Sequence, residues 1–183
     1  MSDRRLNIVD EQDNIVGEET RDNIHKQGLL HREIHVWLVT PSREIIFQHR
    51  AKDKDTFPDL LDATVGGHVE IGDSYEAAAI REVQEEAGLN VTGTDLKLIK
   101  IARDQVYDPV TGTTNNTLRA IFAWLYPGKI TDLKIESGKS LGFEAWSMVR
   151  LFALSAADKK KIVPSLVTDE YMLIYREIEK LLL

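Results

Sequence analysis

Three glutamates and an arginine lie close together near the middle of the chain and could bind a divalent cation. Glu82, Glu85 and Glu86 are spaced at i, i+3 and i+4, so on a helix their carboxylates project from one side. Like charges at this spacing cost roughly a few tenths of a kcal/mol for each exposed pair. Carboxylate oxygens in a chain without cysteine favour Mg²⁺, with Mn²⁺ as a second candidate, over Zn²⁺. The spacing therefore predicts a metal site on one helix face, where Arg81 holds a ligand carboxylate in place.

The residues on either side of this face indicate how the helix is positioned. Asp73 followed by Glu76 predicts a capping box at the start of the helix, and Gly88 is placed to end it. Gly66 and Gly67 precede the helix and leave room for the backbone to approach a ligand closely. The backbone carbonyl of Gly67 is therefore a further candidate ligand of the same metal ion.

A solvated acidic helix face is the alternative interpretation of the glutamates, and in it Arg81 simply pairs with Glu85. The glycines and the fixed spacing favour the metal site, because residues 67–89 resemble the Nudix box, the signature of the Nudix hydrolase superfamily. The box positions in this chain are Gly67, Asp73, Arg81, Glu82, Val83, Glu85, Glu86, Gly88 and Leu89. All but one match the family pattern. Asp73 stands where the family has glutamate, which keeps the charge on a shorter side chain.

The resemblance to the Nudix superfamily implies an α/β fold for most of the chain. The expected architecture is a Nudix-like α/β/α sandwich with a mixed β-sheet. We expect a single Nudix hydrolase domain over residues 1–183, in which residues 1–30 form an N-terminal hairpin extension and residues 164–183 a C-terminal helix.

The same resemblance implies a Mg²⁺-dependent hydrolase that cleaves a diphosphate linkage in a nucleoside diphosphate or a nucleoside diphosphate derivative. A metal-activated water would attack the phosphorus, with Gly67, Glu82, Glu85 and Glu86 at the metal. The catalytic set comprises Glu85, Glu86 and Arg81, of which the arginine orients a carboxylate and does not act as the base. The general base stays open between the two box glutamates and three further candidates, which are Glu70, Glu136 and Glu144.

A second resemblance narrows the subgroup. Residues 31–68, together with His25, resemble the corresponding part of isopentenyl diphosphate isomerases and of the hydrolases most similar to them. In those isomerases, histidines near the positions of His25, His31 and His68 help to hold a metal, and a cysteine at the position of Gly66 carries the protonation chemistry. This chain has no cysteine, and the box that the isomerases have in degraded form is intact. Hydrolysis is therefore favoured, with isomerase-like activity and a noncatalytic ligand-sensing domain as the alternatives.

A basic cluster before the box supplies candidates for substrate binding. Arg50, Lys52 and Lys54 could hold phosphate oxygens, or they could belong to a solvated loop. The histidines are also open to two interpretations, because surface or core packing is a commoner use of histidine than metal binding. Metal binding has its best case at the histidine beside the glycine pair. The histidines concerned are His25, His31, His35 and His68.

Composition and charge exclude several other classes of protein. The chain has 183 residues, of which 43% are hydrophobic and 29% charged, as is typical of a globular domain. Its formal net charge of -7 argues against binding to a nucleic acid polymer, and the expected partner is a small-molecule diphosphate. No run of about 18 apolar residues predicts a membrane span or a signal peptide, so we expect a soluble, cytoplasmic protein. A homodimer is compatible with this interpretation.

Hydrophobic patterning predicts the remaining elements. A hairpin, a short helix ended by Gly28 and a pair of strands are expected before the box, followed by a charged loop and another strand. Three strands and a C-terminal helix capped by Thr168 or Asp169 are expected after it. The predicted strands are 6–9, 15–18, 34–40, 44–49, 63–65, 96–102, 118–126 and 141–146, the first helix is 21–26, the charged loop is 50–62, and the turn between the sixth and seventh strands is 107–112.

Overall fold

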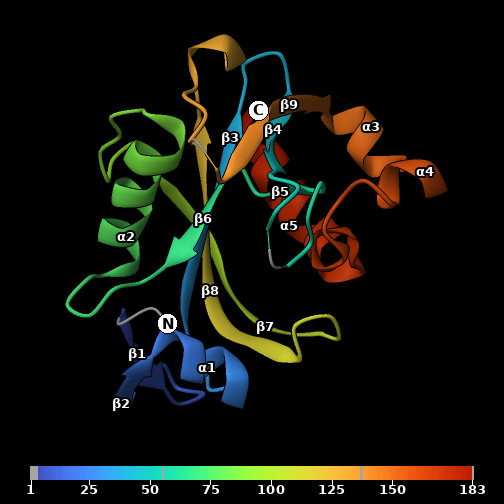
Figure 1. Cartoon of the computed structure of the whole chain (residues 1–183). Helices are drawn as coiled ribbons and strands as arrows, with labels where there is room; N and C mark the ends of the chain where they lie inside the picture. The colour runs from blue at the N-terminus through green and yellow to red at the C-terminus, as the bar shows by residue number, and fades with distance from the viewer. Residues whose placement is uncertain (1–3, 55, 137, 183) are drawn as a thin grey trace.

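Figure 1 shows the computed structural model of the chain, which describes residues 4–54, 56–136 and 138–182. The strands are β1 (Arg5–Val9), β2 (Ile15–Thr20), β3 (His31–Val39), β4 (Glu44–Arg50), β5 (Leu61–Asp62), β6 (Val65–His68), β7 (Lys97–Asp108), β8 (Thr113–Leu125) and β9 (Ser140–Ser147). The helices are α1 (Arg21–Gln27), α2 (Tyr75–Glu82), α3 (Met148–Phe152), α4 (Ala156–Lys159) and α5 (Asp169–Glu179). Shorter helical turns are η1 (Val83–Ala87), η2 (Ile130–Asp132), η3 (Pro164–Val167) and η4 (Lys180–Leu182).

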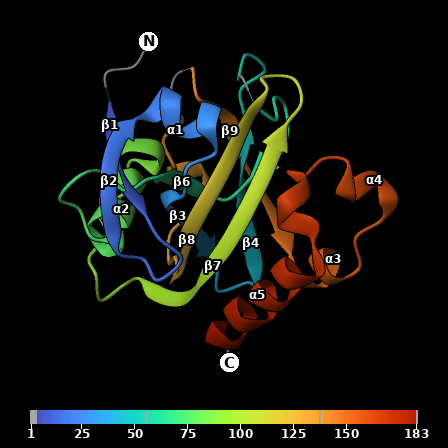
Figure 2. The ribbon, with the colours of Figure 1, turned by 90° about the horizontal axis from the view of Figure 1, so that it is seen from below.

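All the described strands belong to one mixed sheet with β3 at its centre. β3 runs parallel to β8 over its whole length and antiparallel to β6 through residues 33–36. The parallel pair is allowed because the chain between β3 and β8 is long enough to cross over, with α2 as part of the connection. β7 and β8 form a long antiparallel hairpin, seen side by side in Figure 2. The predicted mixed sheet is confirmed.

The core has two parts because successive side chains of β3 point to opposite faces of the sheet. Ile34, Val36 and Leu38 pack in the part that contains buried residues of α2 and η1. Trp37 and Val39 pack in the part that contains buried residues of α5. Figure 1 shows α2 and α5 on opposite sides of the sheet. This arrangement is the expected α/β/α sandwich.

The C-terminal helix is fixed at its start by a cap and by an ion pair. Thr168 is the N-cap, and its hydroxyl accepts a hydrogen bond from the backbone N–H of Tyr171 at 3.2 Å. Glu170 pairs with Lys100 of β7 at 2.5 Å. A C-terminal helix is therefore present, with Thr168 as its cap and not Asp169, but it is shorter than the predicted range 164–183. The turns η3 and η4 flank it, and residue 183 lies outside the described residues. No described helix is long and apolar enough to cross a membrane.

Several predicted boundaries were wrong. β3 begins at His31 and not at residue 34, and β8 begins at Thr113 and not at residue 118. The strand predicted at 63–65 is instead β6, which ends at His68, because the glycine pair is hydrogen bonded to β3 as part of the ladder. The predicted loop 50–62 contains the short β5, which pairs with β4. β7 continues past residue 102 to Asp108, which shortens the turn predicted at 107–112. The hydrophobic pattern did not predict the second half of β7, because this strand is largely exposed and polar. It is held by backbone pairing with β8.

The predicted capping box at Asp73 was also wrong. The N-cap of α2 is Ser74, whose Oγ accepts a hydrogen bond from Ala77 N at 3.1 Å. Asp73 instead points its carboxylate at Arg81. Gly88 ends the helical segment with a φ of 68°, as predicted, because a side chain is disfavoured in that left-handed conformation. Helices α3 and α4 lie in a segment for which we predicted no elements.

Candidate active site and metal-binding groups

Two of the three box glutamates are buried beside the glycine pair of β6. Glu86 Oε2 accepts hydrogen bonds from Gly66 N at 3.2 Å and from Gln48 Nε2 at 3.3 Å. Glu86 Oε1 accepts no hydrogen bond from any residue that the structure describes. At Gly67 a Cβ atom would collide with the side chain of Glu82, so only glycine allows this close approach. The packing of α2 and η1 against β6 therefore brings two buried carboxylates together beside the glycine pair.

The charges of these two carboxylates are not fully compensated by protein groups. Burial, and to a smaller extent the nearby Glu82, raises the pKa of Glu86 to about 7. Burial also raises the pKa of Glu82, although Arg81 opposes this effect. Two neighbouring buried carboxylates are costly unless a cation is shared between them. Their oxygens therefore fit a hard divalent cation such as Mg²⁺.

Arg81 lies between the carboxylates of Glu82 and Glu85. Its Nη1 lies 2.7 Å from Glu82 Oε1 and 3.6 Å from Glu85 Oε2, and its Nη2 donates to the carbonyl of His68 at 3.1 Å. Glu85 has a side chain that is 50% exposed, outside the group formed by Glu82 and Glu86. The reason is that η1 is a π-helical turn with i to i+5 hydrogen bonds, which rotates the i+3 position away from i and i+4. The sequence prediction assumed a regular α-helix here.

A cavity of about 630 Å³ opens beside the buried carboxylates. Its wall includes Glu82, Glu86 and the glycine pair, and it extends along β3 toward the tip of the β7 and β8 hairpin. This volume lies within the usual range for small-molecule sites. The carboxylates and the space for a ligand are therefore part of one site.

The structure adds one lysine to the predicted basic cluster and separates another from it. Lys54 lines the cavity, whereas Lys52 is exposed and lies outside the cavity wall. Lys139 also lines the cavity, where its ammonium group pairs with Glu136 at 2.8 Å. Lys139 is brought there by the pairing of β9 with β4 and by a hydrogen bond from Ala51 N to its carbonyl at 3.2 Å. No local pattern in the sequence could have indicated this long-range contact.

Arg50 lines the cavity, but its guanidinium is bound to protein groups. It donates to the carboxylate of Asp62 at 2.7 Å and to the carbonyl of Thr56 at 2.7 Å. A third hydrogen bond goes to the carbonyl of Phe57 at 3.1 Å. These contacts fix the loop that carries Lys54, so Arg50 supports the cavity wall through this loop.

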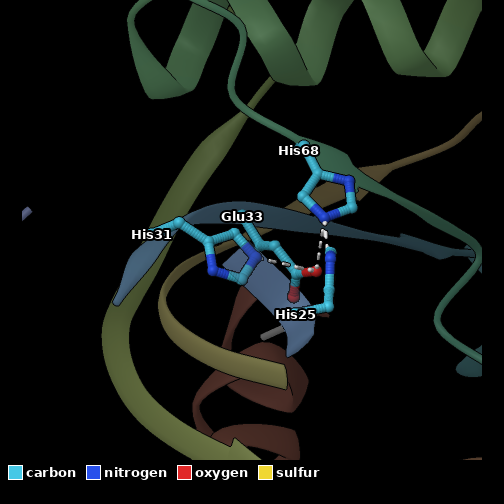
Figure 3. Close-up of side chains that lie close together, drawn as sticks. All are labelled: His25, His31, Glu33 and His68. Carbon is cyan, nitrogen blue, oxygen red and sulfur yellow. Dashed lines mark hydrogen bonds and ion pairs between the residues drawn. The ribbon is translucent and has the colours of Figure 1, made fainter. Parts of the chain in front are cut away.

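Three histidines and a glutamate form a second cluster in the same region (Figure 3). One ligand atom from each of His25, His31, Glu33 and His68 lies within 4.8 Å of the others. They come from α1, β3 and β6, elements that are distant in sequence but adjacent in the sheet. Of these four, Glu33 is the residue that the sequence did not predict. It lies within a predicted strand region, and nothing in its position along the strand indicated that it would lie beside three histidines.

Backbone carbonyls determine which nitrogen of two of these histidines carries the proton. Nδ1 of His25 lies 2.8 Å from the carbonyl of Arg21, and Nδ1 of His31 lies 3.0 Å from the carbonyl of Leu29. A carbonyl can only accept, so both Nδ1 atoms donate and both Nε2 atoms present a lone pair. His31 Nε2 is buried without a hydrogen-bond partner among the described residues. Imidazole nitrogens that carry a free lone pair fit a borderline cation such as Zn²⁺.

Glu33 is held ionised at the edge of this cluster. Arg119 Nη2 donates to Glu33 Oε2 at 2.9 Å, and Asn115 donates to Oε1 at 3.1 Å. Burial opposes ionisation, but Arg119 lowers the pKa of Glu33. Arg119 also pairs with Asp104 at 2.6 Å. Burial, together with Arg119, lowers the pKa of the neighbouring His35 to about 3, so that imidazole is neutral.

Comparison with known proteins places these features in a family. A model of the NUDIX domain matches residues 29–169. An uncharacterized Nudix hydrolase of Streptomyces coelicolor is 41% identical over 87 residues, which are 48% of this chain and 48% of that protein. An isopentenyl-diphosphate Delta-isomerase of Serratia proteamaculans is 35% identical over 88 residues, which are 48% of this chain and 49% of that protein. The chain spans about half the length of the curated relatives it matches.

Among solved structures, DR0079 from Deinococcus radiodurans is similar to this chain over almost its entire length. The TM-score is 0.68 at 22% sequence identity, and the match covers 94% of this chain and 98% of that one. At this identity the likeness supports the fold alone.

Proposed function

The chain belongs to the Nudix family, and from this membership we propose that it hydrolyses a diphosphate linkage in a nucleoside diphosphate or a nucleoside diphosphate derivative. The observation that carries the proposal is the pair of buried carboxylates, Glu82 and Glu86, on the wall of a cavity that also contains Lys54 and Lys139. A diphosphate needs cations around its oxygens, and this cavity supplies both lysine ammonium groups and ligands for a metal.

Glu82 and Glu86 would hold Mg²⁺ or Mn²⁺, with the Gly67 carbonyl and Glu85 as further candidate ligands. When bound, the ion screens the charge of the diphosphate oxygens and acidifies a water molecule. Arg81 keeps Glu82 in place through the contact at 2.7 Å. These roles, with glutamates at the metal and Arg81 holding a carboxylate, are the ones expected from the spacing of the box.

The lysines and Glu86 have separate tasks in the proposed reaction. Lys54 and Lys139 bind phosphate oxygens and orient the linkage. Among the predicted candidates for the general base, Glu86 is the one that lines the cavity. Oε1 of Glu86 is the proposed acceptor, since Oε2 already accepts two hydrogen bonds.

The remaining candidates for the base are absent from the cavity wall. Glu70 pairs with Arg4 at 2.7 Å, and Glu144 accepts a hydrogen bond from Trp146 at 3.1 Å. Oε1 of Glu136 pairs with Lys139, while its Oε2 is buried without a hydrogen-bond partner among the described residues. Glu85 is half exposed and lies 3.6 Å from Arg81. Because none of these four glutamates lines the cavity, the base is assigned to Glu86.

A substrate panel tests the proposal. Nucleoside diphosphates, ADP-ribose, sugar nucleotides and prenyl diphosphates are incubated with the protein and Mg²⁺ or Mn²⁺, and released phosphate or monophosphate is measured. We expect cleavage of at least one nucleoside compound, and a loss of orders of magnitude in Glu86→Gln but not in Lys52→Met. Absence of cleavage across the nucleoside compounds with either metal would refute the proposal.

An isomerase-like activity is the second candidate, and the histidine cluster is the observation in its favour. Proton delivery to carbon needs an acid near an apolar pocket, and Gly66 offers no such group. We therefore keep hydrolysis as the proposed reaction and expect isopentenyl diphosphate to remain unisomerised. The cluster itself is tested by calorimetric titration with Zn²⁺ and Mn²⁺, in which His68→Gln should weaken binding while Lys52→Met should not. Equal affinities in both variants would exclude the cluster as a cation site.

A further inference from the structure

A tyrosine of the C-terminal helix is hydrogen bonded to a histidine of the cavity wall. His35 of β3 lines the cavity and is 8% exposed. Its Nδ1 lies 2.8 Å from the hydroxyl oxygen of Tyr171 on α5. Its Nε2 has no hydrogen-bond partner among the described residues. Because His35 lines the cavity and its Nε2 is not bonded to a described protein group, this nitrogen is available to a ligand in the cavity.

The position of the imidazole relates it to the box carboxylates. His35 is opposite Gly66 in the β3 and β6 ladder, and a Cβ at Gly66 would lie 3.5 Å from Nε2. The N–H of Gly66 in turn donates to Glu86. The imidazole and the Glu86 carboxylate are thus both in contact with one glycine, whose missing side chain leaves space between them. A ligand held at the carboxylates would come within reach of His35.

The chemistry of the proposed substrate selects one proton arrangement. Either the Tyr171 hydroxyl donates to Nδ1, which leaves the proton of His35 on Nε2, or Nδ1 donates to the hydroxyl and Nε2 carries a lone pair. The non-bridging oxygens of a diphosphate only accept hydrogen bonds. A lone pair on Nε2 would therefore repel them, and only the first arrangement presents a donor to the cavity.

We propose that Tyr171 holds His35 as the Nε2–H tautomer and that this N–H donates to a non-bridging oxygen of the substrate diphosphate. His35 is then a substrate-binding residue, and Tyr171 is a positioning residue that acts through it. The proposal rests on the proposed function and adds a residue from the C-terminal helix to the machinery of the site. The expected tautomer is opposite to that of His25 and His31, whose Nδ1 atoms donate to carbonyls.

The same helix offers a matched control. Tyr175 lies one turn after Tyr171 and is fully buried, but its hydroxyl has no hydrogen-bond partner among the described residues. Both tyrosine rings pack against Trp37 in the core. Replacing either tyrosine by phenylalanine therefore removes one oxygen from a similar environment. Only the change at Tyr171 removes a hydrogen bond to His35 on the cavity wall.

The tautomer is measured directly by NMR. The chain has five histidines, so a ¹⁵N-histidine sample gives a small set of ring signals, and His35 is identified by its loss in His35→Gln. We expect Nε2–H in the wild type and in Tyr175→Phe, and a mixture of tautomers in Tyr171→Phe. Methylenediphosphonate with Mg²⁺ should shift the Nε2 signal of His35 in the wild type. Protonation at Nδ1 in the wild type would overturn the proposal, as would a bound probe that leaves Nε2 unchanged.

Kinetics supply a second measurement on whichever diphosphate of the panel is cleaved. Tyr171→Phe should raise KM about tenfold with little change in kcat, and Tyr175→Phe should stay close to the wild type. Equal effects of the two substitutions would reduce Tyr171 to a packing residue and overturn the proposal. If no compound of the panel is cleaved, the proposed function fails, but the tautomer and the response to methylenediphosphonate still decide the role of His35.

Discussion

Replacing Glu86 by glutamine is expected to stabilise the protein at neutral pH in the presence of a chelator while it abolishes hydrolysis. In the wild type a single oxygen, Oε2, accepts the hydrogen bonds from Gly66 and Gln48. The amide oxygen of glutamine can accept both, so the variant keeps the shape and the contacts of the protonated acid. What it removes is a negative charge that the protein buries and that a metal ion would neutralise.

The magnitude follows from the pKa of Glu86. Burial raises this pKa from 4.5 to about 7. Because the pKa in the folded state is the higher one, the stabilising contribution is fully present below pH 4.5 and is lost as the pH rises through about 7. The displacement of the pKa corresponds to about 3 kcal/mol of unfolding free energy. Glu86→Gln should therefore gain about 3 kcal/mol relative to the wild type between pH 4 and pH 8.

Urea denaturation with EDTA, repeated at pH values from 4 to 8, measures this difference. Glu85→Gln is the control, because the Glu85 side chain is 50% exposed, and its stability should follow that of the wild type across the range. Addition of Mg²⁺ should then stabilise the wild type but not Glu86→Gln. A constant stability difference between Glu86→Gln and the wild type from pH 4 to pH 8 would refute the reasoning about this buried carboxylate.

Three further substitutions test other parts of the structure. Lys139→Met should raise KM for the cleaved diphosphate about tenfold and Lys52→Met should leave it unchanged, and equal effects in steady-state kinetics would remove Lys139 from the site. Ser74→Ala should lower the unfolding free energy by about 1 kcal/mol in urea denaturation, and a larger loss in Asp73→Ala that Asp73→Asn does not show would return the cap to Asp73. Gly66→Cys should form no dimethylallyl diphosphate from isopentenyl diphosphate, because the new side chain meets a histidine ring and the box remains arranged for water. Detection of that product by NMR at enzyme-like rates would contradict this assignment.

The features that the sequence predicted well depend on residues close together in the chain. Arg81, Glu82 and Glu86 lie within two helical turns, so their spacing alone brings them to one face. Gly88 ends the segment because its own conformation requires glycine. The cap of α2 shows the limit of prediction from neighbouring residues, because Asp73 was predicted and Ser74 is observed. Both residue types cap helices well, and the choice depends on Arg81, which draws the Asp73 carboxylate away from the helix start.

The features that the sequence did not predict depend on contacts between distant segments. Glu33 gains its role only because β3, β6 and α1 meet, which places its carboxylate among three histidines. Lys139 enters the cavity through the register of β9 on β4. Lys52 was grouped with Lys54 because they are neighbours in the chain, yet only Lys54 lines the cavity. Such differences arise from the tertiary fold and leave no periodic pattern in the sequence.

The alternation along β3 also bears on how proteins of this architecture can diverge. His31, Glu33 and His35 share the face of the strand that carries the polar groups of the site, while Ile34 and Val36 pack toward α2. Substitutions at the first set would change the polar groups on one face of the strand, while the second set packs on the other face. A single inserted residue would exchange the two faces and abolish both. New specificities in such a strand are therefore accessible by point substitution, whereas changes in its length are expected to be eliminated by selection.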